Sequence, residues 1–403
     1  MVGNSAGHGL ALIAGIIVAR FLGKEVFGEY GMIKQTLVYI AVFSTFGLGY
    51  TATKFIAEAK NKNNRNIRQI VAESINITLI TSVLFALLLF VFSKQIAAFL
   101  EAEHLALSLR IFAVNVVFNA LATVQIGILA GFKAFKQIAK NNAIVGVTTF
   151  VLSVVLTYFW GIEGALSALL FASLFSCVLN NIAVRKNVRV YPYSEQKSDS
   201  VVKQLFAFSL PIALQEGMHN LTVWLQIVLL VKLTNYGEVG LFSAAHQWMM
   251  AVLFIPGVLK NVALSHLAEA NDDKTQHKKV FNRIVLVNFT ATLIPCLLVF
   301  ALSGIITSFY GVSFARLPLV LNIAVFSAVF LAMQHAYIQN YLSANKVWTH
   351  FSLSTFFNVL TLVLAFLLIS RNAEKGAEIL VSILLVVSAV RLLTYHLVLK
   401  VGK

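Results

Sequence analysis

Charged residues are scarce in this sequence. Only 12% of its 403 residues are Asp, Glu, Lys or Arg, whereas 59% are hydrophobic. A soluble domain carries roughly 25% charged residues, so a chain this apolar cannot cover itself with polar surface in water. Runs of about 20 apolar residues, each long enough to cross the hydrocarbon of a membrane, recur along the whole length. The composition therefore predicts an all-α polytopic membrane protein.

Catalytic and metal-binding patterns are also missing. The two cysteines, Cys177 and Cys296, lie inside apolar segments, where they are typical small hydrophobic residues. The sequence has no Walker loop, no nucleophile elbow, no metal-ligand spacing of His and Cys, and no dinucleotide fingerprint. It therefore predicts neither an enzyme nor an ATP-driven pump, and it indicates no metal and no cofactor.

Acidic residues are fewer than basic ones, 16 against 31, which gives a formal net charge of +15. The distribution argues against nucleic acid as a partner. About 21 basic residues fall in one set of connections between apolar runs and about 8 in the other. The positive-inside rule places the richer set, with both termini, in the cytoplasm, and anionic membrane lipids attract it further. We therefore expect a multi-pass membrane protein with both termini in the cytoplasm.

Twelve apolar segments are long enough to be transmembrane helices. We expect them at residues 4–22, 31–55, 70–92, 107–131, 141–160, 163–184, 205–231, 240–263, 281–302, 318–342, 350–369 and 377–399. They form two six-helix lobes, residues 1–184 and 204–403, joined by a basic cytoplasmic linker at 185–203. An even number of helices per lobe predicts a pseudo-two-fold axis along the membrane normal.

The two lobes carry similar patterns at an offset of about 212 residues. Gly28 aligns with Gly240 and Gln35 aligns with Gln247, which indicates duplication of one ancestral unit. By the same offset the first span is about ten residues shorter than the seventh. We expect a start site assigned too late or a trimmed N-terminus, and a short first helix is the alternative.

Polar side chains inside the spans predict a substrate cavity between the lobes. Ionisable groups within a membrane are costly unless they face a cavity or a partner. Nearly all of the polar residues inside the spans fall in the first, second, seventh and eighth spans. By the repeat, the first span is equivalent to the seventh and the second to the eighth. The predicted cavity residues are Arg20, Lys34, Gln35, Gln215, His219, Gln226, His246, Gln247 and Lys260. Two further residues, Glu216 and Asn220, are candidates for binding a coupling ion or proton.

The predicted cavity is mainly cationic, which favours an anionic amphiphile because phosphate groups bind well to Lys and Arg. The same residues also have structural explanations. Lys34 and Lys260 can extend to a membrane interface, and Arg20 can anchor a helix end there. Glu216 can pair with a lysine. The histidines His219 and His246 can hydrogen-bond between packed helices, so the two kinds of role stay open.

Short motifs resemble a known family. The run VARFLGKEVFGEYG contains Arg20, Gly23, Glu25, Phe27 and Gly28, and it is followed by FGLGYTATKFIAEA; GIEGALSALL occurs later. These segments resemble bacterial polysaccharide flippases of the multidrug/oligosaccharidyl-lipid/polysaccharide exporter superfamily, and the topology is similar over essentially the whole chain.

The resemblance implies transfer of an undecaprenyl-diphosphate-linked oligosaccharide from the cytoplasmic to the periplasmic leaflet. It implies alternating access of two lobes, driven by an ion or proton gradient, and polysaccharide polymerase or chain-length machinery as partners. Arg20, Lys34 and Lys260 would meet the diphosphate and sugars. The chain lacks the extra helix pair of the lipid II flippases, which argues against a peptidoglycan precursor.

Three other classes remain as alternatives. A cation-coupled multidrug or small-molecule exporter of the same superfamily shares the topology, but its cavity would be richer in carboxylates. A major-facilitator transporter usually has Gly and Asp in the loop after its second helix, and here that loop reads AEAKNKNNRNIRQ. A membrane glycosyltransferase or polymerase would need a large periplasmic loop or catalytic carboxylates.

Overall fold

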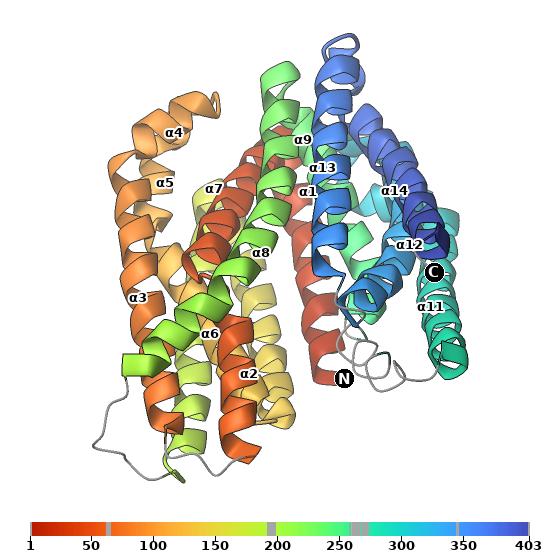
Figure 1. Cartoon of the computed structure of the whole chain (residues 1–403). Helices are drawn as coiled ribbons and strands as arrows, with labels where there is room; N and C mark the ends of the chain where they lie inside the picture. Colours follow the sequence, from red (N-terminus) through yellow and green to blue (C-terminus); the bar gives the residue numbers. More distant parts are fainter. Residues whose placement is uncertain are drawn as a thin grey trace. The chain divides into compact units, whose positions relative to one another are not determined.

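The computed structural model describes residues 2–61, 66–191, 199–257, 259, 267, 274–343 and 346–401. Throughout these ranges the regular structure is helical, without strands (Figure 1). Within them, seven helices are long and apolar enough to cross a membrane. The predicted all-α, multi-pass class is therefore confirmed, whereas the total of twelve spans and the two-fold symmetry stay predictions.

The first predicted span and most of the second lie in α1 (Val2–Ser44), which is interrupted at Gly23, where the backbone is not helical (φ 72° and ψ 168°). Glycine permits this backbone conformation because it has no β-carbon. The second span ends earlier than expected. Phe46 and Gly47 both have positive φ, so the chain turns there, and the remainder of the span forms α2 (Leu48–Asn61).

The next apolar segment forms α3 (Ile67–Val91), close to its predicted bounds. Three short helices follow it: α4 (Ser93–Phe99), η1 (Glu103–Leu105) and α5 (Ala106–Phe112). The predicted span 107–131 is divided between α5 and α6 (Val114–Gly131), which adjoin at Ala113.

Two predicted spans, 141–160 and 163–184, lie within α7 (Phe135–Val188), whose 54 residues are interrupted at Gly161 with φ 55° and ψ −132°. A straight helix of this length would extend about 80 Å, far more than the roughly 30 Å of membrane hydrocarbon. A β-carbon on Gly164 would overlap the carbonyl oxygen of Leu156, so the chain folds back closely at this point. The two halves of α7 are therefore separate spans, as the sequence predicts.

The second half of the chain forms helices close to five of its six predicted spans; the predicted span 240–263 is wrong in its end, because α9 ends at Val252, and residues 260–263 lie outside the described residues. The helices are α8 (Asp199–Leu233), α9 (Tyr236–Val252), α11 (Lys274–Tyr310), η2 (Val312–Phe314), α12 (Leu317–Ser343), α13 (Val347–Ile369), η3 (Ala373–Lys375) and α14 (Gly376–Val401).

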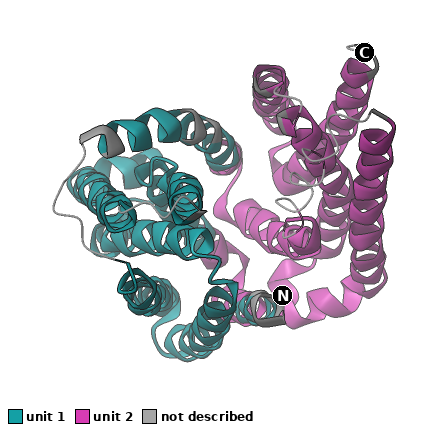
Figure 2. Cartoon of the chain, turned by 60° about the horizontal axis from the view of Figure 1, so that its bottom comes forward, with its two compact units in different colours: residues 1–14, 29–224 teal, residues 15–28, 225–403 magenta. Residues whose placement is uncertain are grey.

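The chain forms two compact units, coloured separately in Figure 2. Unit 1 contains residues 1–14 and 29–224, and unit 2 contains residues 15–28 and 225–403. Part of α1 thus belongs to unit 2, and most of α8 belongs to unit 1. The predicted lobes, 1–184 and 204–403 with their linker, describe the halves of the sequence and stay a prediction.

Each unit is built around one central helix. In unit 1, α6 packs against α2, α3 and α7; in unit 2, α12 packs against α9, α11 and α14. In the most apolar stretches of α6 and α12, 50% and 56% of the residues are buried, against 17–39% in the other candidate spans. The surrounding helices are therefore less covered by protein than α6 and α12, which is appropriate for contact with lipid.

Candidate functional site

Within unit 1, the second part of α1 packs against α8 through aromatic side chains. The indole Nε1 of Trp224 donates a hydrogen bond to Thr36 Oγ1 at 3.0 Å, and its ring stacks on Tyr39 with centroids 5.7 Å apart. Phe43 fills the space beside Gly217, 3.3 Å from where a β-carbon would lie. These contacts fix the rotation of both helices and hence the direction of their polar residues.

Lys34 is exposed, although Ile33 and Leu37 beside it on α1 are fully buried. Its ammonium group lies 5.8 Å from the centroid of the Tyr30 ring. Gln35 is half-buried. An ammonium group in a membrane-spanning segment is stable only near water, an anion or a polar partner. Lys34 therefore lies on a face of α1 that the core of unit 1 does not cover, and its place in a substrate cavity stays a prediction.

The polar residues of α8 are also only partly covered. Glu216 and Asn220 are half-buried, and His219 is exposed. The side-chain amide of Asn220 donates a hydrogen bond to the backbone oxygen of Glu216 at 2.9 Å, not to the Glu216 carboxylate. Among the residues that the structure describes, no cation forms an ion pair with Glu216. Gln215 is on α8, but its side chain lies outside the described set.

The predicted cavity residues of unit 2 differ in exposure. Arg20 is exposed, whereas Gln226 is buried. The ring of His246 stacks on Phe242 with centroids 5.7 Å apart. Gln247 is half-buried and packs so closely on α1 that a β-carbon on Gly15 would overlap its carboxamide.

The predicted residues are divided between the two units. In unit 1 the group on α1 and α8 consists of Lys34, Gln35, Gln215, Glu216, His219 and Asn220. In unit 2 the group on α1, α8 and α9 consists of Arg20, Gln226, His246 and Gln247. Lys260 lies outside the described residues. A single cavity lined by both groups stays a prediction.

Sequence reasoning missed the role of Glu238 at the start of α9. The Asn235 side chain caps this helix by accepting a hydrogen bond from the Glu238 amide at 3.1 Å. The Glu238 carboxylate is buried, pairs with Arg316 at 2.7 Å and accepts from the Ala377 amide at 2.8 Å. Asn followed three residues later by Glu was a usable signal for a helix N-terminus. These contacts hold the start of α9 in place, which gives Glu238 a structural role.

Comparison with solved structures defines the fold. An inward-facing multidrug resistance MATE family transporter of the MOP superfamily superposes with a TM-score of 0.84 at 15% identity, covering 98% of this chain and 95% of that one. The lipid II flippase MurJ in an inward closed conformation gives a TM-score of 0.76 at 15% identity, covering 98% and 86%. This chain therefore has the same fold as these two proteins.

Sequence comparison defines the family. The family described as "Polysaccharide biosynthesis protein" matches residues 1–259, and the chain belongs to it. The EPS I polysaccharide export inner membrane protein EpsE of Ralstonia solanacearum is 22% identical over 371 residues, 90% of this chain and 84% of EpsE. Stage V sporulation protein B of Bacillus subtilis (strain 168) is 23% identical over 322 residues, which cover 74% of this chain and 61% of that protein. The resemblance to polysaccharide flippases is confirmed, and these relatives agree with a transporter rather than an enzyme.

Proposed function

We propose that this protein moves an oligosaccharide linked to undecaprenyl diphosphate across the bacterial inner membrane, with both termini in the cytoplasm. The observation that carries the proposal is the family match over residues 1–259, together with the alignment of 90% of the chain to a polysaccharide export protein. The translocated units would then pass to polysaccharide polymerase and chain-length machinery.

Transport would proceed by alternating access of two six-helix lobes. Two observations support such a duplicated design. The central helices α6 and α12 end at Gly131 and Ser343, which are separated by the repeat offset of about 212 residues. Gly28 and Gly240, which have the same separation, approach the backbones of Tyr236 and Lys24 respectively. Reciprocal contacts of this kind are characteristic of two-fold symmetry.

The chemistry of the exposed cations suits a diphosphate. Lys34 and Arg20 are exposed although each lies in a long apolar helix. Their charges can replace part of the hydration of phosphate oxygens as the lipid-linked substrate enters. Glu216 and Asn220 supply oxygen atoms on α8 that can bind a coupling cation, and Glu216 can take up a proton.

A genetic experiment tests the function. Deleting the gene in its host should remove the surface polysaccharide and cause lipid-linked repeat units to accumulate, and the wild-type gene should restore both. Lys34→Ala and Lys260→Ala should each restore polysaccharide poorly. Lys94→Ala is the matched control, because Lys94 is an exposed lysine of unit 1 outside the predicted cavity.

The outcomes separate the function from its site. Normal polysaccharide in the deletion strain contradicts the proposed function. Full rescue by both lysine variants contradicts a cationic cavity but leaves the function standing. The multidrug-exporter alternative instead predicts that the deletion strain becomes sensitive to cationic dyes while its polysaccharide is unchanged.

A further inference from the structure

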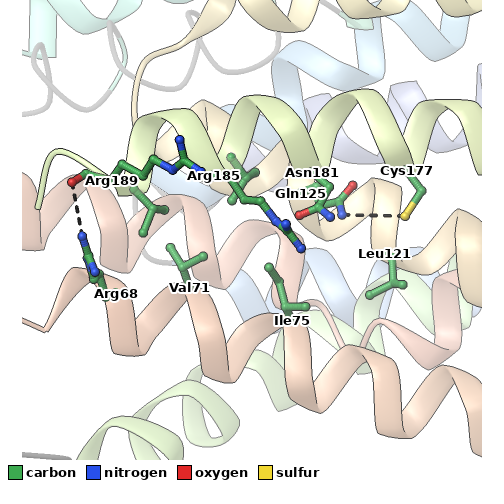
Figure 3. Close-up of a pocket in the computed structure, with 11 residues that line it drawn as sticks. Arg68, Val71, Ile75, Leu121, Gln125, Cys177, Asn181, Arg185 and Arg189 are labelled. Carbon is green, nitrogen blue, oxygen red and sulfur yellow. Dashed lines mark hydrogen bonds between the residues drawn. The ribbon is translucent and has the colours of Figure 1, made fainter. Parts of the chain in front are cut away.

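A pocket of about 430 Å³ lies between α3, α6 and α7 of unit 1 (Figure 3). It contains none of the residues of the predicted transport cavity. Its lining residues are Arg68, Val71, Ile75, Leu121, Gln125, Cys177, Asn181, Val184, Arg185, Val188 and Arg189.

Side chains on facing sides of α7 and α3 form most of the pocket wall. Near the end of α7, every fourth residue lines the pocket: Cys177, Asn181, Arg185 and, directly after the helix, Arg189. This spacing places the four on one helix face. The facing stripe of α3 begins with Arg68 and continues with apolar residues. In Figure 3, Arg68 and Arg189 lie at one end of the pocket, the Arg185 side chain extends toward its middle, and Cys177 lies at the other end.

Three arginines, Arg68, Arg185 and Arg189, line the pocket, and the lining residues that the structure describes include no carboxylate. Arg68 Nη2 donates to the backbone oxygen of Arg189 at 3.2 Å, which links α3 to the end of α7. The N-terminus of α3 carries about half a positive charge, and the C-terminus of α7 carries about half a negative one. Because these dipole charges roughly cancel, the side chains of Arg68, Arg185 and Arg189 determine the charge. Their mutual repulsion would be relieved by an anion.

Two polar atoms of the lining are buried without partners among the described side chains. Arg68 Nε is a donor, and Gln125 Oε1 is an acceptor. Gln125 is only 3% exposed, and its Nε2 contacts Cys177 Sγ at 3.7 Å. Leaving buried polar groups unpaired is unfavourable, so a bound group with both phosphate oxygens and hydroxyls would satisfy both atoms.

We propose that this pocket binds the headgroup of an anionic lipid, with its phosphate in the part lined by arginines and a hydroxyl toward Gln125. The apolar side chains Val71, Ile75 and Leu121 belong to membrane-spanning helices and can contact the start of the lipid chains. Basic pockets between transmembrane helices on the cytoplasmic side are suited to such headgroups. The proposal does not depend on the transported substrate.

Binding can be measured by native mass spectrometry on the full-length protein, purified in detergent and freed of lipid. The titrants are phosphatidylglycerol, zwitterionic phosphatidylcholine and undecaprenyl phosphate. Arg185→Gln removes one lining charge. Lys186→Gln is the matched control, because Lys186 is also exposed, adjacent in sequence and outside the lining.

Phosphatidylglycerol should bind the wild type at least about tenfold more tightly than phosphatidylcholine, and Arg185→Gln should weaken it by about tenfold. Arg189→Gln should have a similar effect, and Lys186→Gln should leave affinity within about twofold. If only undecaprenyl phosphate shows this dependence on Arg185, the occupant is the carrier lipid rather than a bilayer phospholipid. Equal effects of Arg185→Gln and Lys186→Gln, or no effect of either, would overturn the proposal.

Discussion

Gly28 and Gly240 mark a reciprocal helix crossing. A β-carbon on Gly28 would overlap the carbonyl oxygen of Tyr236, and one on Gly240 would overlap the carbonyl oxygen of Lys24. In each pair the partner lies four residues before the opposite glycine. Small residues allow backbones to approach this closely in membrane proteins. The α1–α9 crossing therefore depends on the absence of both side chains.

Substituting either glycine should separate the two helices. Gly28→Ala and Gly240→Ala should each lower the free energy of unfolding by about 1–3 kcal/mol, because the added methyl overlaps backbone. The double variant should lose less than the sum, since the first substitution already parts the helices. Denaturant unfolding in detergent measures this. Gly304→Ala is the control, because its β-carbon would meet nothing within 4 Å. If the double variant lost the sum of the two single losses in unfolding free energy, that would contradict a shared crossing.

The Glu238–Arg316 pair should stabilise the start of α9. Glu238→Ala leaves the Ala377 amide without its acceptor and removes one acceptor of Arg316, which keeps the backbone oxygen of Glu374. Because the Arg316 side chain is 42% exposed, water can partly replace the carboxylate. We expect a loss of about 1–3 kcal/mol in the free energy of unfolding. Glu374→Gln is the control, since Arg316 bonds only its backbone oxygen. Equal stability of the two variants would show that the buried pair contributes nothing.

A buried hydroxyl joins α13 and α14 of unit 2. The Tyr395 hydroxyl lies 3.0 Å from His350 Nδ1 and 3.1 Å from Arg391 Nη2, and Tyr395 is 0% exposed. Tyr395→Phe should cost about 1–3 kcal/mol of unfolding free energy, because buried His350 loses a partner. Tyr50→Phe, at a 53% exposed residue, should have little effect. A thermal unfolding midpoint that is the same for both variants would contradict this network.

The sequence predicted the helices well where apolar runs and glycines coincide. Gly161 separates two runs that together are far too long for one crossing, so the turn inside α7 could be predicted from length alone. The division of the second span could not, because Phe46 and Gly47 adopt positive φ in a segment that is otherwise continuously apolar. Hydropathy does not distinguish a continuous helix from two helices joined by a tight turn.

The positions of cations were predicted better than their surroundings. Lys34 was predicted to be a polar residue within a helix, but its exposure depends on which face of α1 packs in unit 1. Arg68, Arg185 and Arg189 were counted only as cytoplasmic charges. Their shared pocket arises because α3, α6 and α7 pack together, and no local pattern reports contacts between segments so distant in sequence.

Glu216 offers a test of coupling. A carboxylate can bind a proton or cation, whereas the amide in Glu216→Gln has the same shape but no charge to titrate. For each charge moved, a potential of 100 mV supplies about 2.3 kcal/mol. In proteoliposomes with a fluorescent lipid-linked saccharide, an imposed ion or proton gradient should accelerate transfer by the wild type. Glu216→Gln should transfer at the rate seen without a gradient.

Glu73→Gln is the matched control for this measurement. Glu73 is also a half-buried glutamate in a membrane-spanning helix of unit 1, α3, but it lies outside the predicted coupling site. Its variant should keep the full response to the gradient. If Glu216→Gln also keeps that response, the energy-coupling group is elsewhere, and the half-buried carboxylate of α8 serves only to bind substrate or stabilise the helix.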